Sequence, residues 1–130
     1  MKHTVVLSLG SNYGNREEAV ASAIKLMSEV LTTAQSSTVY TTPPLSGIGE
    51  PYANAVIAGE WDKDFVALEQ LCKQTEIEFG RTDERRRLHQ VPLDIDIVMF
   101  DGKIIRPADF GYAFFQTGYR QLSPDTENPD

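Results

Sequence analysis

Two aspartates, Asp94 and Asp96, stand one residue apart in the run Leu93-Asp94-Ile95-Asp96-Ile97. Alternate residues of a β-strand point to the same face, so the two carboxylates share a face, roughly 6.5 to 7 Å apart along the strand. Two carboxylates so close repel each other, whereas Mg²⁺ prefers one or two carboxylates together with water and phosphate oxygens. The pattern indicates either a magnesium site or the polar face of an amphipathic strand.

Arg81 and the run Arg85-Arg86-Arg87 precede this strand in a polar segment. Guanidinium groups match phosphate oxygens with paired hydrogen bonds. An aspartate pair next to an arginine-rich segment is the composition that phosphoryl transfer needs, because cations must stabilise the phosphate charge. A solvated charged loop would have the same arginines, and that alternative stays open.

Other polar residues carry weaker signals. The turn Gly10-Ser11-Asn12 lacks the lysine and the spacing of a P-loop, so it indicates a tight structural turn rather than phosphate contact. His3 and His89 are isolated and lack metal-ligand spacing. Cys72 is the single cysteine, and we expect it to be buried in a helix.

Hydrophobic periodicity predicts the elements that position these residues. In chain order it predicts a strand over 5–9, a helix over 16–31, strands over 38–41 and 55–61, a helix over 65–79, a loop over 81–92, and a strand over 93–100 that ends in an Asp101-Gly102 hairpin. Asn15 and Asp64 are the expected N-caps of the two helices.

This β-α-β-β-α-β order predicts an α+β fold of the ferredoxin-like kind, a sandwich with both helices packed on one face of an antiparallel sheet. The other face would then be free to carry chemistry. We expect residues 1–122 to form a single domain and the acidic tail, residues 123–130, to be disordered.

Composition limits the classes of function. The chain has 130 residues, 41% of them hydrophobic and 24% charged, with no apolar run long enough to span a bilayer and no secretory signal at its start. The formal net charge of −7 argues against a nucleic-acid partner or an anionic membrane surface. We therefore expect a cytoplasmic protein, and the oligomeric state stays open.

Five segments together resemble the 6-hydroxymethyl-7,8-dihydropterin pyrophosphokinases of folate biosynthesis. They are Leu9-Gly10-Ser11-Asn12, Val39-Tyr40-Thr41-Thr42-Pro43-Pro44-Leu45, Tyr52-Ala53-Asn54-Ala55, Glu76 with Gly80-Arg81, and Leu93-Asp94-Ile95-Asp96-Ile97. They occur in the family's order, and the spacing between Arg81 and the aspartates also matches. The resemblance covers residues from about 4 to 105.

The resemblance implies transfer of pyrophosphate from ATP to the hydroxymethyl group of the pterin, with release of AMP. It implies that Asp94 and Asp96 hold two Mg²⁺ ions together with ATP. It assigns the pterin to Thr42, Pro43, Pro44, Leu45, Tyr52, Asn54 and Tyr119, with the two tyrosines stacked on the ring faces. It assigns the nucleotide to Arg81, Arg85, Arg86, Ile97 and Tyr112, and catalysis to Arg81 and Arg87.

The chain departs from the family pattern in places, so we predict a divergent and C-terminally short member. Leu88-His89-Gln90-Val91 stand where the family has tryptophan, glycine, proline and arginine, Phe110-Gly111 replace a proline-histidine pair, and Thr117 replaces an arginine. The arginines at 85–87 are candidates to replace the missing cation. Two alternatives remain: a noncatalytic relative that binds a pterin-like ligand or a nucleotide, and a ferredoxin-like interaction domain.

Overall fold

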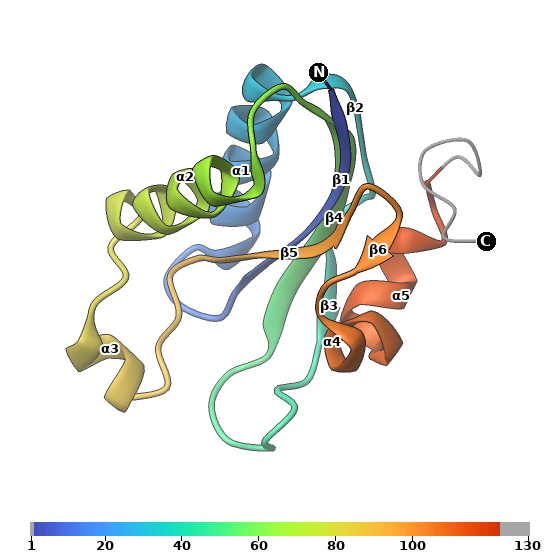
Figure 1. Cartoon of the computed structure of the whole chain (residues 1–130). Coiled ribbons are helices and arrows are strands. Elements are labelled where there is room, and N and C mark those ends of the chain that lie inside the picture. The colour runs from blue at the N-terminus through green and yellow to red at the C-terminus, as the bar shows by residue number, and fades with distance from the viewer. Residues whose placement is uncertain (1, 123–130) are drawn as a thin grey trace.

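The structure, a computed structural model of the chain, describes residues 2–122. The expected disordered tail, residues 123–130, lies outside the described residues. Within 2–122, six strands form one antiparallel sheet with helices on both sides (Figure 1). The strand order is β2-β4-β1-β5-β6, and β3 also pairs with β4. The predicted α+β class is therefore confirmed.

Three long strands form the centre of the sheet: β1 (His3–Ser11), β4 (Tyr52–Trp61) and β5 (Asp94–Phe100). Side chains alternate between the faces. Odd-numbered residues of β1 and β4 belong to one apolar core, and the even-numbered residues point to the opposite face. Asp101 and Gly102 have positive φ angles of 52° and 78°, which fits the predicted hairpin to β6 (Lys103–Ile104).

Helices α1 (Arg16–Val30) and α2 (Phe65–Glu78) cover the face that carries the larger core (Figure 1). Both predicted N-caps are present. The Asn15 Oδ1 atom accepts from the backbone N–H of Glu18 at 3.3 Å, and the Asp64 Oδ1 atom accepts from that of Ala67 at 2.9 Å. Cys72 is buried in α2, as expected.

The strand predicted over 38–41 corresponds to β3 (Tyr40–Thr42), which pairs antiparallel with β4 as expected. A further strand, β2 (Thr32–Ser36), was not predicted and lies along the same side of β4. Ser37 separates them: its backbone N–H donates to the Val56 carbonyl at 2.8 Å, and its hydroxyl accepts from the Val56 N–H at 2.9 Å. These bonds replace regular ladder pairing, so the strand breaks without leaving the sheet.

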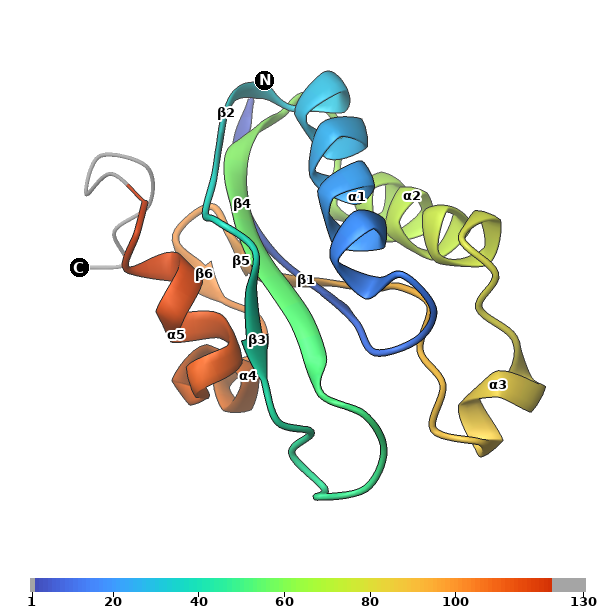
Figure 2. The ribbon, with the colours of Figure 1, turned by 180° about the vertical axis from the view of Figure 1, so that it is seen from behind.

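The prediction that both helices pack on one face and leave the other face free was incomplete. Helices α4 (Pro107–Gly111) and α5 (Ala113–Tyr119) lie on the opposite side of the sheet from α1 and α2, and Figure 2 shows the same layers from behind. Phe115 of α5 is fully buried in a second apolar cluster with Val6, Val56 and Met99. Only part of this second face therefore stays open.

The segment 81–92, predicted as a loop, contains the short helix α3 (Asp83–Arg87). The Thr82 hydroxyl caps it by accepting from the backbone N–H of Arg85 at 3.1 Å. A threonine before two acidic residues is a helix-start signal. The segment was nevertheless predicted as a loop because it is so polar. Among the helices of residues 2–122, none is both long enough and apolar enough for a membrane span.

Gly118 allows α5 to approach the sheet closely. A Cβ atom there would come within 2.7 Å of both the Tyr40 Oη atom and the Val56 Cγ2 atom. We expect Gly118→Ala to lower the free energy of unfolding by about 1 to 3 kcal/mol, because the added methyl group has no space. The measurement is urea denaturation followed by circular dichroism.

Gly111→Ala is the matched control, because a Cβ at Gly111 would have no atom within 4 Å. It should leave the midpoint nearly unchanged. Equal stability of the Gly118→Ala variant and the parent would show that α5 does not pack this closely.

Candidate active site

The second face of the sheet is open at one end, where three strands bring small and polar side chains together. Gly10 of β1 pairs with Asn54 of β4 on one side and with Asp94 of β5 on the other. Two residues away, Ser8 pairs with Asp96. A Cβ atom at Gly10 would lie 3.5 Å from the Asn54 Oδ1 atom, so glycine keeps this floor low.

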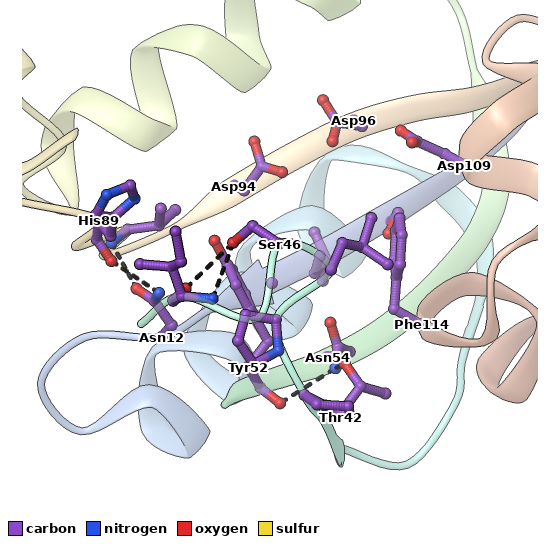
Figure 3. Close-up of a pocket in the computed structure, with 18 of the residues that line it drawn as sticks. Asn12, Thr42, Ser46, Tyr52, Asn54, His89, Asp94, Asp96, Asp109 and Phe114 are labelled. Carbon is purple, nitrogen blue, oxygen red and sulfur yellow. Dashed lines mark hydrogen bonds between the residues drawn. The ribbon is translucent and has the colours of Figure 1, made fainter. Parts of the chain in front are cut away.

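A cavity of about 520 Å³ lies over this floor (Figure 3). We call it the first cavity. Tyr52 and Phe114 line it from different sides, and Asp94 and Asp96 lie along another edge (Figure 3). The Asn54 Nδ2 atom donates to the hydroxyl of Thr42 at 2.7 Å, which holds the side-chain amide in position. The lining thus combines aromatic rings with a few fixed polar groups, which suits a flat polar heterocycle.

A second cavity, of about 490 Å³, is lined by α2, β5 and residues 105–106. Apolar side chains such as Phe65 and Ile97 line it together with charged ones. Of the described residues, five line both cavities, and all five are charged: Arg81, Arg86, Asp94, Asp96 and Arg106. The boundary between the two cavities is therefore where charge concentrates.

Asp96 carries the strongest electrostatic perturbation at this boundary. Burial and the neighbouring charge of Asp94 raise the pKa of Asp96 to about 8. A divalent cation between the carboxylates would remove the repulsion, so this donor pair fits magnesium. Within residues 2–122, no three His, Cys, Asp or Glu side chains are placed to bind a metal ion together. An ion here would need further oxygen ligands from water or from a substrate.

Arg81 contacts two carboxylates through one atom of its guanidinium. Its Nη1 atom lies 2.8 Å from Asp94 Oδ1 and 3.2 Å from Glu76 Oε2. Burial lowers the pKa of Arg81, but the hydrogen bond to Asp94 and the charge of Asp94 outweigh burial. The pKa of Arg81 is therefore raised above its ordinary value. Glu76 also accepts from the backbone N–H of Ile95 at 2.8 Å, which ties α2 to the start of β5.

Arg106 and Asp109 lie at the Asp96 end of the pair. The Arg106 Nε atom donates to Asp109 Oδ2 at 2.5 Å, and the Arg106 Nη1 atom is 4.0 Å from Asp96 Oδ1. The hydrogen bond to Asp109 raises the pKa of Arg106. In Figure 3 the side chain of Asp109 lies next to that of Asp96. Each aspartate of the pair thus has an arginine beside it.

Asn12 joins the end of β1 to the segment that carries the arginines. Its Oδ1 atom accepts from the Val91 N–H at 2.6 Å, and its Nδ2 atom donates to the His89 carbonyl at 2.9 Å (Figure 3). Gly49 of the β3–β4 loop lies close by, since a Cβ there would be 3.5 Å from His89 Cβ. The prediction of a turn over 10–12 was wrong for Gly10 and Ser11, which belong to β1 and pair with β4. Asn12, the residue after the strand, has a structural role through these two bonds.

Comparison with known proteins agrees with this arrangement. Residues 6–124 match the family model described as 7,8-dihydro-6-hydroxymethylpterin-pyrophosphokinase (HPPK). The chain belongs to this family. The match extends beyond the segments that carry the resemblance in the sequence and includes α4 and α5.

Two similar proteins are known from Arabidopsis thaliana. One, a folate synthesis bifunctional protein, is 34% identical over 98 residues, which are 74% of this chain and 20% of the relative. The other, a mitochondrial folate synthesis bifunctional protein, is 34% identical over 105 residues, 79% of this chain and 19% of the relative. The HPPK chain thus spans about a fifth of the length of these relatives.

The structure places most of the expected pterin residues of this HPPK chain in the first cavity: Thr42, Pro43, Pro44, Leu45, Tyr52 and Asn54. Tyr119 lies elsewhere. It stacks on Phe115 at 5.2 Å between ring centroids, beside the apolar core of the second face. Residues 115 and 119 share one side of α5 because they are four positions apart, and that side faces the sheet. The α5 aromatic that lines the cavity is Phe114.

The expected nucleotide residues divide between the cavities and the surface. Arg81 and Arg86 line both cavities, and Ile97 lines the second. Arg85 instead lies over the ring of Tyr13, with its guanidinium carbon 4.8 Å from the ring centroid.

Arg87, expected to be catalytic, and Tyr112, expected at the nucleotide, are outside the described lining of both cavities. Tyr112 is exposed and stacks on Phe114 at 5.8 Å. The five-residue helix α3 separates its three arginines around its axis, so adjacent arginines cannot all face the site.

Sequence reasoning missed Arg106, Asp109 and Phe114. An arginine and an aspartate three positions apart on either side of Pro107 are a signal for a local ion pair at a helix start. Their closeness to Asp96 was missed although the hairpin was predicted, because regular pairing with β5 stops at Ile104. Beyond it, the backbone N–H groups of Ile105 and Arg106 both donate to the Val98 carbonyl, an irregular pairing that keeps the chain beside β5.

Because Asp96 is less easily ionised in the fold than in the unfolded chain, its charged form destabilises the protein. We expect Asp96→Asn to raise the free energy of unfolding at pH 8 by at least about 1 kcal/mol, since one pKa unit corresponds to about 1.4 kcal/mol. The gain should shrink as the pH falls towards 4, where Asp96 of the folded parent is protonated. Urea denaturation across pH 4 to 8, without divalent cations, measures it.

Asp62→Asn is the control, because Asp62 is exposed between β4 and α2. It should shift stability little at any pH. A loss of stability in the Asp96→Asn variant at pH 8 would contradict the repulsion between the two carboxylates.

Proposed function

We propose that this chain transfers pyrophosphate from ATP to the hydroxymethyl group of 6-hydroxymethyl-7,8-dihydropterin and releases AMP, as a step of folate biosynthesis. The observation that carries the proposal is the charged boundary between an aromatic-walled cavity and a second cavity. Membership of the HPPK family supports the same reaction. The cytoplasm is the compartment we propose for it.

The first cavity would take the pterin. Tyr52 and Phe114 would supply aromatic surfaces for the flat ring system. Polar side chains held in place by the protein, such as Asn54, would bind the edge of the ring and set its orientation. Asn54 uses its Nδ2 atom within the protein, and its Oδ1 atom would accept from an N–H group of the ligand. The hydroxymethyl group would then point towards Asp94 and Asp96 at the boundary.

The second cavity would take the nucleotide, with its phosphates at the boundary. Ile97 and Phe65 line this cavity and would offer apolar surface for the base, and Arg81 and Arg86 would bind the phosphates. Asp94 and Asp96 would hold magnesium, which, when bound, supplies positive charge for the phosphate oxygens. This division places the two substrates on opposite sides of the residues that line both cavities.

The reaction balances with these groups. The hydroxymethyl oxygen forms a bond to the β-phosphorus of ATP, and the bond from that phosphorus to the oxygen bridging the α- and β-phosphates breaks. AMP leaves with the bridging oxygen, and the hydroxyl proton is lost to solvent. Holding the two substrates in line is most of what the protein must do.

The direct test is release of AMP from ATP, followed with the dihydropterin alcohol as acceptor and with the alcohol omitted. AMP release that depends on the alcohol would support the proposal. Pterin binding without any AMP release would favour the noncatalytic alternative.

Removing both carboxylates should abolish the dependence of nucleotide binding on magnesium. We expect the Asp94→Asn, Asp96→Asn double variant to bind a non-hydrolysable ATP analogue at least about 10-fold more weakly at millimolar Mg²⁺, because an amide is a poor magnesium ligand. Isothermal titration calorimetry with and without Mg²⁺ measures this. Unchanged magnesium-dependent affinity would contradict the metal assignment.

Removing either aromatic wall should weaken pterin binding. We expect Tyr52→Ala and Phe114→Ala each to cost roughly 1 to 3 kcal/mol of binding free energy through lost burial and stacking. Tyr13→Ala is the control, since Tyr13 is outside the described lining of both cavities. Quenching of pterin fluorescence gives the affinities. Parent-like binding by Phe114→Ala would show that α5 does not form the pterin wall.

A further inference from the structure

Arg106 comes from a different part of the chain than Arg81 and Arg86, the other two arginines that line both cavities. Arg81 and Arg86 precede β5, whereas Arg106 follows β6, so the cations come from two separate parts of the chain. Arg81 contacts Asp94, and Arg106 lies nearest to Asp96. Positive charge therefore flanks the carboxylate pair at both ends.

The two flanking arginines also differ in how much of each guanidinium is already used. Arg81 donates to Asp94 and to the Leu93 carbonyl and lies 3.2 Å from Glu76. Arg106 uses its Nε atom for Asp109, its Nη1 atom is at 4.0 Å from Asp96, and its side chain is 48% exposed. The outer edge of the Arg106 guanidinium is thus the freer of the two to bind phosphate oxygens.

From this geometry we propose that Arg106, held in place by Asp109, binds the nucleotide phosphates at the Asp96 end of the site. The proposal rests on the proposed function, in which the phosphates lie at the boundary of the two cavities. Arg106 is then a catalytic residue in contact with substrate. Asp109 is a positioning residue, which acts through Arg106.

Asp109 is suited to that positioning role by its placement and burial. Its side chain is only 16% exposed, and it lies in α4, whose first residue is Pro107. Proline restricts the backbone next to Arg106, and the bond from Nε fixes the inner edge of the guanidinium. A long side chain ordered before the ligand arrives loses less conformational entropy on binding.

The negative charge of Asp109 would by itself repel the phosphates, and Arg106 offsets that repulsion. A carboxylate that close to Asp96 adds negative charge to a place where phosphates must bind, as Figure 3 shows for the two side chains. Arg106 neutralises the charge of Asp109, so the Arg106–Asp109 pair as a whole does not repel the phosphates. Without Arg106, Asp109 would be unfavourable for phosphate binding.

The test compares a non-hydrolysable ATP analogue with AMP, each titrated calorimetrically into the full chain with Mg²⁺. Arg106→Gln should weaken analogue binding by about 10- to 100-fold, the usual loss for a charge-assisted hydrogen bond. AMP binding should change by less than about twofold, because AMP lacks the β- and γ-phosphates. Arg106→Lys should restore part of the loss.

Lys103→Gln is the matched control. Lys103 lies on β6, three residues before Arg106, and is outside the described lining of both cavities. It removes the same unit of charge from the same hairpin, and analogue affinity should stay within about twofold of the parent's. Thermal unfolding of each variant shows that it is folded.

Asp109→Asn tests the positioning role through a double-mutant cycle. Alone it should weaken analogue binding severalfold, because Arg106 loses its anchor. In the Arg106→Gln background the same change should have no further weakening effect. The rate of AMP release should fall by about 10² to 10³ in Arg106→Gln, as for loss of one well-placed donor.

Three results would overturn the inference, in distinguishable ways. Analogue affinity of Arg106→Gln equal to that of Lys103→Gln would overturn the role of Arg106 and leave the proposed function in place. Equal weakening of AMP and analogue would assign Arg106 a structural role instead. A parent chain that binds neither nucleotide would overturn both the inference and the proposed function.

Discussion

The carboxylates of Asp94 and Asp96 lie on the same face of β5, partly buried and close enough that ionisation of one disfavours ionisation of the other. Such a pair destabilises a fold unless positive charge is near. Arg81 and Arg106 supply it from either end, and each is itself held by a further acid, Glu76 or Asp109. The ion pairs of this region thus offset the repulsion between Asp94 and Asp96.

This network depends on the strand next to β5. Gly10 and Ser8 of β1 face the same side as the aspartates, and their small size leaves room above the sheet. Farther along the same face, Val6 and Val98 are buried in one apolar cluster with Phe115 of α5. One face therefore changes from packed core to open site within a few residues. Close packing at one end determines where the cavity can begin.

Helix α5 connects stability to the site. Its approach to the sheet depends on Gly118, whose backbone N–H donates to the Tyr40 hydroxyl at 3.0 Å, while that hydroxyl donates to the Phe114 carbonyl. Burial raises the pKa of Tyr40 to about 12, so the hydroxyl stays protonated and can keep both bonds. The bonds between Tyr40 and α5 thus help to fix the position of Phe114, one of the aromatic walls of the first cavity.

Much of the fold and part of the site followed from local pattern, because alternation and capping depend on neighbours in the chain. Local patterns were enough to predict the α+β class, the helix caps at Asn15 and Asp64, and the shared face of Asp94 and Asp96. The resemblance carried by short segments also pointed to Thr42, Tyr52 and Asn54, which line one cavity.

Which arginines and which aromatic ring reach the site depends on the packing of segments that are distant in the chain. Arg81 and Arg86 line both cavities, whereas Arg85 and Arg87 are outside their described lining, and Phe114 rather than Tyr119 lines the first cavity. Arg106 comes near Asp96 because, beyond the predicted hairpin, its backbone N–H still donates to the Val98 carbonyl of β5. These outcomes depend on the rotation of short helices and on contacts between distant segments, and no local pattern in the sequence records either.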